Sequence, residues 1–392
     1  MKNSYKKVVD DFGEEWDKFN HLDVDVIDQK KIFDSYFKIF PWHIVNKNSS
    51  VGIDIGCGSG RWAKFVVDKT KELILLDASK KALSVAKENL KNKNNVKFFE
   101  QSVGDISLNN NSVDFAYSLG VLHHIPDIQS ALKEINRVLK PESPFLVYLY
   151  YSFENKPFFY KFIWMISNPV RYLISRLPFK LKFLITQIIS LFIYYPLARL
   201  SKLFKIMNLP YKNIPMWQYA DLSFYVMRTD ALDRFGTKIE KRYSKQQIYN
   251  LLNDSNFKEI KFSDDPPYWC VLAKKKIAMC GIAGFINLTN KNNDSTNLSL
   301  LNKFCDLLSH RGPDSNGLWY DLEEKIFLAH TRLSINDLTK TGSQPMINKN
   351  NGQTVIFNGE IYNHKEIRLN NLKDYNIKWI GNSDTETLLK TI

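Results

Sequence analysis

Short apolar runs separated by helical patterns mark the first 150 residues of the chain. Residues 51–55 and 145–151 are nearly continuous apolar runs bounded by polar turn residues. Runs of this length are typical of strands that are buried on both faces of a sheet. Residues 127–139 place four apolar side chains on one helical face, and Pro141 then ends the helix. The pattern predicts an α/β domain with a mainly parallel sheet.

Further signals indicate where this domain closes. Ser244 and Gln247 form a capping-box pattern that opens a helix ending near Leu252. The segments FKEIKF (257–262) and YWCVLA (268–273) follow and predict an antiparallel pair of strands. We therefore expect the first domain to cover residues 1–277.

Composition agrees with a folded chain of two or three domains. The 392 residues are 44% hydrophobic and 24% charged, which excludes a fibrous or wholly disordered protein. The four cysteines are too widely spaced for a zinc-ligand set and too few for a disulfide scaffold, so we expect no metal site. The first residues contain no apolar signal region, so we expect a cytoplasmic protein.

The net charge of +13 is concentrated in one segment, residues 155–220, which contains ten Lys and Arg residues and no Asp or Glu. The same segment is rich in Phe, Tyr, Leu and Ile. Its apolar run, residues 183–198, is shorter than the ~20 residues that a spanning helix needs. We expect a helical insert that is either a lid with a solvated basic face or a helix pair at an anionic membrane surface, peripheral to the inner face. Nucleic acid is not an expected partner.

A glycine-rich turn carries the first candidate chemistry. Residues 51–61 read VGIDIGCGSGR, so a strand runs into a turn with three glycines and a helix begins behind it. Such a turn lets a ligand approach the backbone, and nicotinamide, flavin and methyl-donor enzymes all use one. The spacing here is G-x-G-x-G. Asp77 ends the next predicted strand, where a carboxylate can accept hydrogen bonds from both ribose hydroxyls.

Two more motifs, Asp105-Ile106 and Ser118-Leu119-Gly120, end the third and fourth predicted strands. With all four motifs in order, residues 45–151 resemble the class I S-adenosylmethionine-dependent methyltransferases. The resemblance implies a Rossmann-like α/β fold and S-adenosylmethionine as cofactor, although Asp54 and Asp105 could instead cap helices or turns. The residues that it implies for cofactor binding are Asp54, Gly56, Gly58, Gly60, Asp77, Asp105, Ile106, Leu119 and Gly120.

Methyl transfer to a hydroxyl also requires a base. His123 and His124 follow the fourth predicted strand, where an acceptor would approach, and His124 is the candidate catalytic base. Either histidine could instead only pack. The FGEEW (12–16), DRFGTKIEKRYS (233–244) and PPYWCVL (266–272) segments show a looser resemblance to methyltransferases of surface-polysaccharide gene clusters, in which FGEEW corresponds to a cap. That resemblance implies a small-molecule, saccharide or glycolipid acceptor.

A second series of motifs begins in mid-chain at Met279-Cys280. HRGPDSNG (310–317), AHTRLSI (329–335), QPM (344–346), FNGEIYN (357–363) and NSDTE (382–386) follow in order. Residues 279–392 therefore resemble the glutaminase domain of glutamine-hydrolysing asparagine synthetases. This is a class II glutamine amidotransferase domain with an α+β N-terminal-nucleophile fold, and its substrate is glutamine.

In such a domain a cysteine attacks the glutamine amide while its own free amine accepts the proton. The resemblance implies Cys280 as the nucleophile and Asn358 and Gly359 as donors to the oxyanion. The residues that it implies for glutamine binding are Arg332, Leu333, Ser334, Ile335, Asn358, Gly359, Glu360 and Asp384. Cys305 lies in an apolar helical pattern and is expected in the core, and Asp384 could also be a helix N-cap.

Two departures from that family change the expected activity. Because 279 residues precede Cys280, its nitrogen is an amide in the intact chain and cannot act as the base. The sequence also reaches residue 392 without a motif of the synthetase domain. We expect a partial glutaminase domain, joined either as a natural fusion or as two merged reading frames. The alternatives are an asparagine synthase or glutamine amidotransferase that acts only with Cys280 freed and with the missing C-terminal part present, and a first half that serves as a membrane-docking module.

Overall fold

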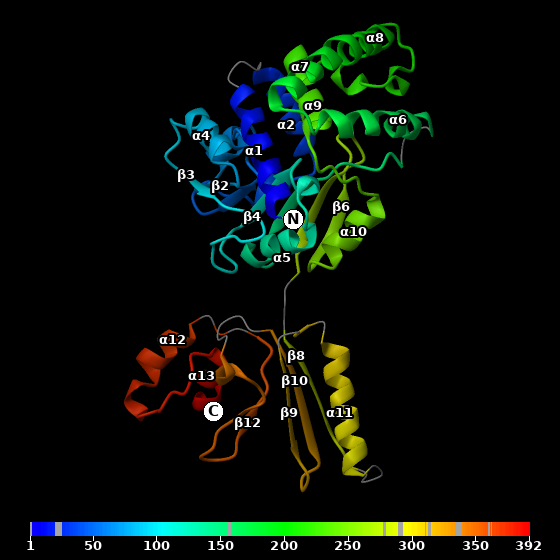
Figure 1. Cartoon of the computed structure of the whole chain (residues 1–392). Helices are drawn as coiled ribbons and strands as arrows, with labels where there is room; N and C mark the ends of the chain where they lie inside the picture. The colour runs from blue at the N-terminus through cyan, green and yellow to red at the C-terminus, as the bar shows by residue number, and fades with distance from the viewer. Residues whose placement is uncertain are drawn as a thin grey trace. The chain divides into compact units, whose positions relative to one another are not determined.

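The computed structural model of the chain divides into two compact units, Met1–Lys276 and Ile277–Ile392 (Figure 1). Each unit has its own sheet and its own core. The described residues are 2–19, 26–154, 158–276, 280–288, 293–309, 311–312, 315–333, 339–359, 361 and 363–392, without the side chains of 2–8, 17 and 158.

The first unit is built on a seven-stranded sheet with the order β3-β2-β1-β4-β5-β7-β6. Strands β1 to β5 are parallel, and β7 runs antiparallel to both of its neighbours, so the predicted α/β fold is confirmed. The chain moves outward from β1 to β3 and then returns to β4, so the strand order reverses between β1 and β4. The strands are β1 Val51–Ile55, β2 Glu72–Asp77, β3 Val96–Glu100, β4 Phe115–Leu119, β5 Pro144–Tyr148, β6 Phe257–Phe262 and β7 Cys270–Lys275.

Helices cover both faces of this sheet because its strands are apolar on both sides. Ile74 and Leu76 of β2 join the core that α5 and α10 cover, whereas Leu73 and Leu75 join the core under α2, α3 and α4. This alternation is the two-residue period of a strand. The helices outside the insert are α1 Lys2–Lys18, α2 Val26–Tyr36, α3 Ala63–Val66, α4 Lys80–Asn89, α5 Ile128–Val138 and α10 Lys245–Asn253.

Two helix starts follow directly from their sequence signals. Asp127 is the N-cap of α5, and its carboxylate accepts the backbone N–H of Ser130. Ser244 and Gln247 form a complete capping box at the start of α10, as predicted.

The segment expected as a helical insert forms α6 Phe158–Ile174, α7 Phe179–Ile189, the π-helical turn η4 Ser190–Tyr194 and α8 Tyr195–Ile206, and α9 Phe224–Gly236 follows it. These helices gather at one end of the first unit (Figure 1). Buried Tyr194, Ala198 and Met227 form a small core of their own between η4, α8 and α9.

The apolar run was expected to be too short for a membrane-spanning helix, and this expectation was wrong. Phe179–Ile206 is one continuous helix of 28 residues, and by length and composition it qualifies as a candidate span. The expectation ended the run at the charged residues Lys182 and Arg199, whereas the helix continues past both of them and also passes through Pro196. Proline lacks the N–H that would bond to the carbonyl of Phe192, and its ring crowds that carbonyl. The π-helical turn η4 immediately before Pro196 accommodates this defect without ending the helix.

Several basic residues of the insert are structural. Lys182 is buried and forms a 3.0 Å ion pair with Asp11 of α1. Arg171 donates to the carbonyl of Thr237 at 2.9 Å, and Arg199 donates to the carbonyls of Ala220 and Leu222. These side chains fasten the insert to the rest of the unit, so only part of the local positive charge faces solvent.

The second unit contains a three-stranded antiparallel sheet with the order β8-β10-β9 and a small pair of strands. Leu301 and Cys305 of α11 pack against Phe327 and Ala329 of β10, so Cys305 lies in the core as expected. The elements are β8 Gly281–Ile286, α11 Asp294–Leu308, β9 Ser315–Asp321, β10 Ile326–Arg332, β11 Met346–Ile347, β12 Thr354–Val355, α12 His364–Glu366 and α13 Asp384–Thr391.

Candidate functional site

A cavity of about 140 Å³ lies where β1, β2 and β4 end, at the point where the strand order reverses. Gly56 follows β1, Asp77 ends β2, and Leu119 and Gly120 end β4; all four line the cavity. Open α/β sheets bind their ligands at this position. The structure therefore brings these four predicted cofactor residues together.

The glycine turn is held in shape by its backbone and by Asp77. Gly56 and Gly58 have positive φ angles of 72° and 54°, which a side chain would strain. The N–H of Gly58 donates to one carboxylate oxygen of Asp77 at 2.9 Å, and the N–H of Ser79 donates to the other at 2.8 Å. A Cβ atom on Gly58 would lie 2.8 Å from the indole of Trp16, so this position of the turn has no room for a side chain.

Asp54 lies beneath this turn and does not line the cavity. Its side chain is 2% exposed, and its Oδ2 atom has no hydrogen-bond partner among the described residues. Burial raises the pKa of Asp54 to about 8 and also raises the pKa of Asp77. Gly58 and Gly60 shape the turn from outside the cavity lining.

The two residues predicted to frame the adenine, Asp105 and Ile106, lie outside the cavity lining. Asp105 is exposed and outside the cavity lining, and Ile106 lies in the hydrophobic core. Gln101 and Val103, a few residues earlier in the same loop, line the cavity. The loop turns its apolar Ile106 inward toward α5, which leaves the first residues after β3 to face the ligand.

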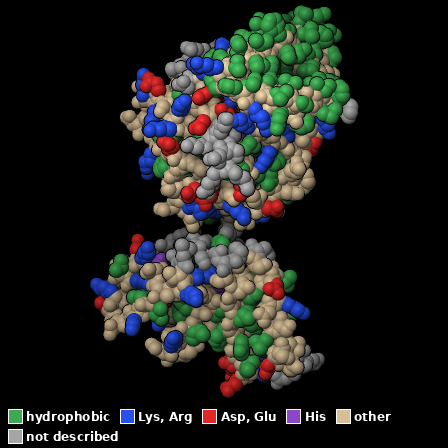
Figure 2. Space-filling view, in the orientation of Figure 1, with side chains coloured by type: hydrophobic (Ala, Val, Ile, Leu, Met, Phe, Trp, Pro, Cys, Tyr) green, Lys and Arg blue, Asp and Glu red, His purple; other side chains and the backbone are tan. Residues whose placement is uncertain are grey.

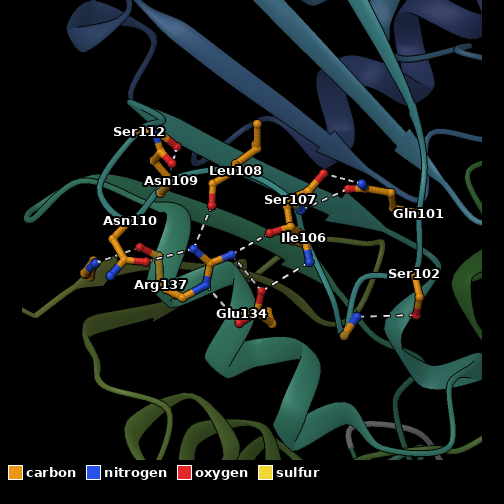
Figure 3. A network of polar contacts seen from close by, with 12 residues as sticks. Gln101, Ser102, Ile106, Ser107, Leu108, Asn109, Asn110, Ser112, Glu134 and Arg137 are labelled. Carbon is orange, nitrogen blue, oxygen red and sulfur yellow. Dashed lines mark hydrogen bonds and ion pairs between the residues drawn. The ribbon is translucent and has the colours of Figure 1, made fainter. Parts of the chain in front are cut away.

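Two side chains of α5 fix this loop from behind (Figure 3). Arg137 donates to the carbonyls of Ile106 at 2.6 Å and Leu108 at 2.7 Å, and it pairs with Glu134 at 2.9 Å. Glu134 accepts the N–H of Ile106, and the pair with Arg137 lowers the pKa of this carboxyl. Gln101 is in turn bonded to Ser107 through its side-chain amide.

Helix α1 supplies one wall of the cavity through Phe12, Glu15 and Trp16. The guanidinium of Arg61 lies 5.1 Å from the ring of Trp16 and 4.5 Å from that of Trp62, within cation–π range. Glu15 is buried, and this burial together with Asp233 raises its pKa. The resemblance over FGEEW had indicated a cap here.

Helix α9 supplies three charged residues, Asp230, Asp233 and Arg234, which sequence reasoning missed. Asp233 and Arg234 begin the DRFGTKIEKRYS segment, and positions 230, 233 and 234 share one helical face. Four carboxyl groups and two guanidinium groups line the cavity in all. This excess of acidic groups suits a ligand that carries positive charge. Among the described residues, no three His, Cys, Asp or Glu side chains are placed to hold a metal ion.

His124 lines the cavity and is oriented from both sides. Its Nδ1 lies 2.6 Å from the carbonyl of Ile239, to which it donates, and its Nε2 lies 3.5 Å from a carboxylate oxygen of Asp233. The hydroxyl of Tyr150 donates to the other oxygen of Asp233. His123 is fully buried against Tyr150 outside the cavity lining, and burial lowers its pKa, so its position fits packing.

A second cavity, of about 150 Å³, adjoins the first and shares Tyr148, Tyr150 and Arg234 with it. Its lining is rich in aromatic rings, including Trp164 of α6 and Trp217. Among the described residues no hydrogen bond or ion pair holds the Arg234 guanidinium, although Asp230 and Tyr219 lie near enough to raise its pKa. Space for a second molecule therefore continues directly from the first cavity.

In the second unit, Cys280 lies immediately before β8 and beside the end of β10. The backbone N–H of Leu333 points at its Sγ at 3.5 Å, and Arg311 donates to its carbonyl at 3.3 Å. Arg332 is 8% exposed and donates to the carbonyl of Thr339 at 2.8 Å. The structure thus brings Cys280 and Leu333 together.

Another predicted glutamine residue, Asp384, lies at the start of α13. Asp384 accepts the N–H of Ile361 at 3.0 Å, which ties it to the loop that carries Asn358 and Gly359. Ser383, and not Asp384, is the N-cap of α13. Ser334, Ile335 and Glu360 lie outside the described residues.

Comparison with known families assigns both units. The family model of a methyltransferase domain matches residues 53–147, and that of a glutamine amidotransferase domain matches residues 279–392. The chain therefore combines a methyltransferase domain with a glutamine amidotransferase domain of the N-terminal-nucleophile type, as the two resemblances predicted.

Individual relatives match one unit or the other. The second unit is 41% identical over 90 residues to asparagine synthetase [glutamine-hydrolyzing] 2 of Bacillus subtilis, a match that covers 23% of this chain and 12% of that protein. The first unit is 36% identical over 98 residues to demethylmenaquinone methyltransferase of Staphylococcus carnosus, covering 24% of this chain and 41% of that protein. The solved structure of a SAM-dependent methyltransferase from Thermotoga maritima matches 68% of this chain and 99% of its own, with 14% identity and a TM-score of 0.38. The chain thus spans less than half the length of these two curated relatives.

Proposed function

We propose that the first unit binds S-adenosylmethionine in the cavity at the ends of β1, β2 and β4 and transfers its methyl group to an acceptor. When bound, the cofactor supplies an activated methyl group on a sulfonium sulfur. The observation that carries the proposal is the position of Asp77. It ends β2, lines the cavity, and is oriented by the N–H groups of Gly58 and Ser79.

The residues present fit such a cofactor. A cationic sulfonium and ammonium are matched by the carboxyl groups of Glu15, Asp230 and Asp233. The carboxylate of Asp77 suits the ribose hydroxyls, and Gln101 and Val103 suit an adenine ring at the neighbouring strand end.

The chain's own side chains would align and deprotonate the acceptor. Methyl transfer is an in-line displacement, so the protein chiefly supplies proximity and orientation. His124 presents Nε2 toward the cavity side that Asp233 and Tyr150 also occupy. With Nδ1 donating to Ile239, Nε2 is the nitrogen that would take an acceptor proton, and Asp233 would stabilise the resulting imidazolium.

A ligand-induced thermal shift tests the cofactor. S-adenosylhomocysteine at a hundredfold excess over its Kd should stabilise the unit by about 2.7 kcal/mol and raise its Tm by several degrees. Asp77→Ala should abolish the shift. Asp105→Ala is the matched control, because Asp105 is exposed and outside the cavity lining. Equal shifts in wild type and Asp77→Ala would refute the assignment.

For the acceptor we propose a saccharide or lipid-linked saccharide that enters through the second cavity. Aromatic walls bind apolar ring faces and chains, and Arg234 places a guanidinium where the two cavities meet, within reach of a phosphate or carboxylate. Radiolabelled S-adenosylmethionine, incubated with the protein and a cell lipid extract, should label a species from which mild acid releases a labelled saccharide. Label confined to protein or nucleic acid would overturn this proposal.

We propose glutamine hydrolysis as a second activity, supported by the position of Cys280 beside the N–H of Leu333. The proton of the thiol needs an acceptor, and a free α-amine at Cys280 would provide one, whereas an amide cannot. A protease site introduced immediately before Cys280 allows the amine to be released in the full chain. Glutamate should form from glutamine only after cleavage, and Cys280→Ala should remain inactive. Equal hydrolysis before cleavage would refute the need for the free amine.

A further inference from the structure

The helical insert carries a large exposed apolar surface. Of the 24 exposed large hydrophobic side chains in the described part of the first unit, 20 lie between Phe159 and Leu209. Figure 2 shows hydrophobic side chains gathered over the end of the unit that α6, α7 and α8 form. We call the exposed apolar side chains of α6, α7, η4 and α8 the insert face. Examples that are each more than half exposed are Met165, Leu173, Leu184, Phe192, Leu203 and Ile206.

Soluble monomeric proteins rarely expose so many contiguous apolar side chains to water, so the insert face indicates an interaction site. Only 28% of the most apolar stretch of Phe179–Ile206 is buried, which distinguishes it from an ordinary core helix. The opposite side of the same helix is attached to the unit, because Lys182 pairs with Asp11 and the side chains of Thr186, Ser190 and Ser201 are buried. A helix fastened along one side in this way presents its other side to a surface, and does not cross it.

The charges around the insert face indicate which surface it meets. Lys161, Lys180 and Lys202 are exposed, and none of them forms an ion pair within 4.0 Å among the described residues, although Lys202 lies near Asp221, which pairs with Lys205. No Asp or Glu occurs between residues 158 and 220. Two copies of the chain packed through this face would bring lysines against lysines with no carboxylate from the segment between them. Anionic lipid headgroups would instead complement these lysines.

We propose that the insert face docks on an anionic lipid surface, with α6, α7 and α8 lying in the plane of the headgroups. The apolar side chains enter the boundary between headgroups and acyl chains, and the lysines contact lipid phosphates, as in other interfacial helices. This docking does not depend on the cofactor or on methyl transfer, so it succeeds or fails independently of the proposed function.

Vesicle flotation with the full chain tests the proposal. The protein should float with vesicles of phosphatidylcholine that contain about one-third phosphatidylglycerol and should bind at least tenfold more weakly to phosphatidylcholine alone. Leu173→Glu with Phe192→Glu should reduce flotation at least tenfold. Ile44→Glu with Tyr249→Glu is the matched control, because both side chains are 46% exposed and lie outside the insert. The control should float like wild type.

A second variant separates charge from apolar contact. Lys180→Glu with Lys202→Glu should abolish the preference for phosphatidylglycerol while leaving circular dichroism and the cofactor-induced thermal shift unchanged. The proposal is overturned if wild type does not float. It is also overturned if the chain forms a stable dimer by light scattering that Leu173→Glu with Phe192→Glu dissociates, because a second copy would then cover the face.

Discussion

Substitution of Arg137 tests whether α5 holds the loop that lines the ligand cavity. Its guanidinium donates to the carbonyls of Ile106 and Leu108 and to the side chain of Asn110, and it pairs with Glu134. The side chains of Arg137 and Glu134 are 31% and 24% exposed, so water screens the pair only in part. Hydrogen bonds from a charged donor contribute about 1.5–3 kcal/mol each, but bonds from one group are not additive. Arg137→Ala should therefore lower the free energy of unfolding by about 2–4 kcal/mol.

Urea unfolding at neutral pH measures this loss, with Lys91→Ala as control. Lys91 forms an ion pair with Glu88 in which both side chains are about 60% exposed, so its removal should leave the midpoint unchanged. The difference between wild type and Arg137→Ala should shrink as the pH falls through the lowered pKa of Glu134, because the protonated carboxyl no longer needs the guanidinium. Because the loop carries Gln101 and Val103, affinity for S-adenosylhomocysteine should also fall. Unfolding of Arg137→Ala at the same urea concentration as Lys91→Ala would refute the role of this side chain.

Two further predictions concern titratable groups near the cavity. The pKa of Asp54 is about 8 in the folded chain and near 4 in the unfolded chain. Between these pH values the folded state therefore holds one more proton than the unfolded state. The free energy of unfolding should fall as the pH rises from about 4 to about 8. Asp54→Asn should remove this part of the decline in urea unfolding at pH 5 and pH 8, and an unchanged pH dependence would contradict the assignment. The asparagine of His124→Asn can still donate to the carbonyl of Ile239. This variant should lower the rate of methyl transfer to a hydroxyl acceptor by a factor of about 10²–10⁴, with little change in cofactor affinity. Radiolabelled S-adenosylmethionine measures the transfer rate. A parallel loss of cofactor affinity would indicate a structural role.

Local patterns in the sequence predicted the framework of the first unit. The strands, the N-cap at Asp127 and the capping box at Ser244 depend on nearby residues, and so does the placement of Asp77 and Gly120 at strand ends. The carboxyl ends of parallel strands lie at the same edge of the sheet. Residues that follow successive strands are therefore expected to lie close together from their sequence positions alone.

Contributions from distant segments could not be predicted in this way. Asp230, Asp233 and Arg234 reach the cavity from α9, and although Asp233 and Arg234 open the DRFGTKIEKRYS segment, that segment did not indicate that their side chains face the cofactor cavity. For the loop after β3 the sequence does not indicate which residues face the cavity, because the packing of Ile106 against α5 decides this. The full length of the helix Phe179–Ile206 was missed because the prediction ended at Lys182 and Arg199, whereas the helix continues past both charged residues.

A crystal structure of the full chain with S-adenosylhomocysteine tests the central assignment most directly. We predict density in the cavity at the ends of β1, β2 and β4, with both ribose hydroxyls bonded to Asp77 and the adenine beside Gln101 and Val103. The sulfur should face the side of the cavity that His124 and Tyr150 line. An empty cavity at saturating ligand, or a ribose bound away from Asp77, would contradict the account.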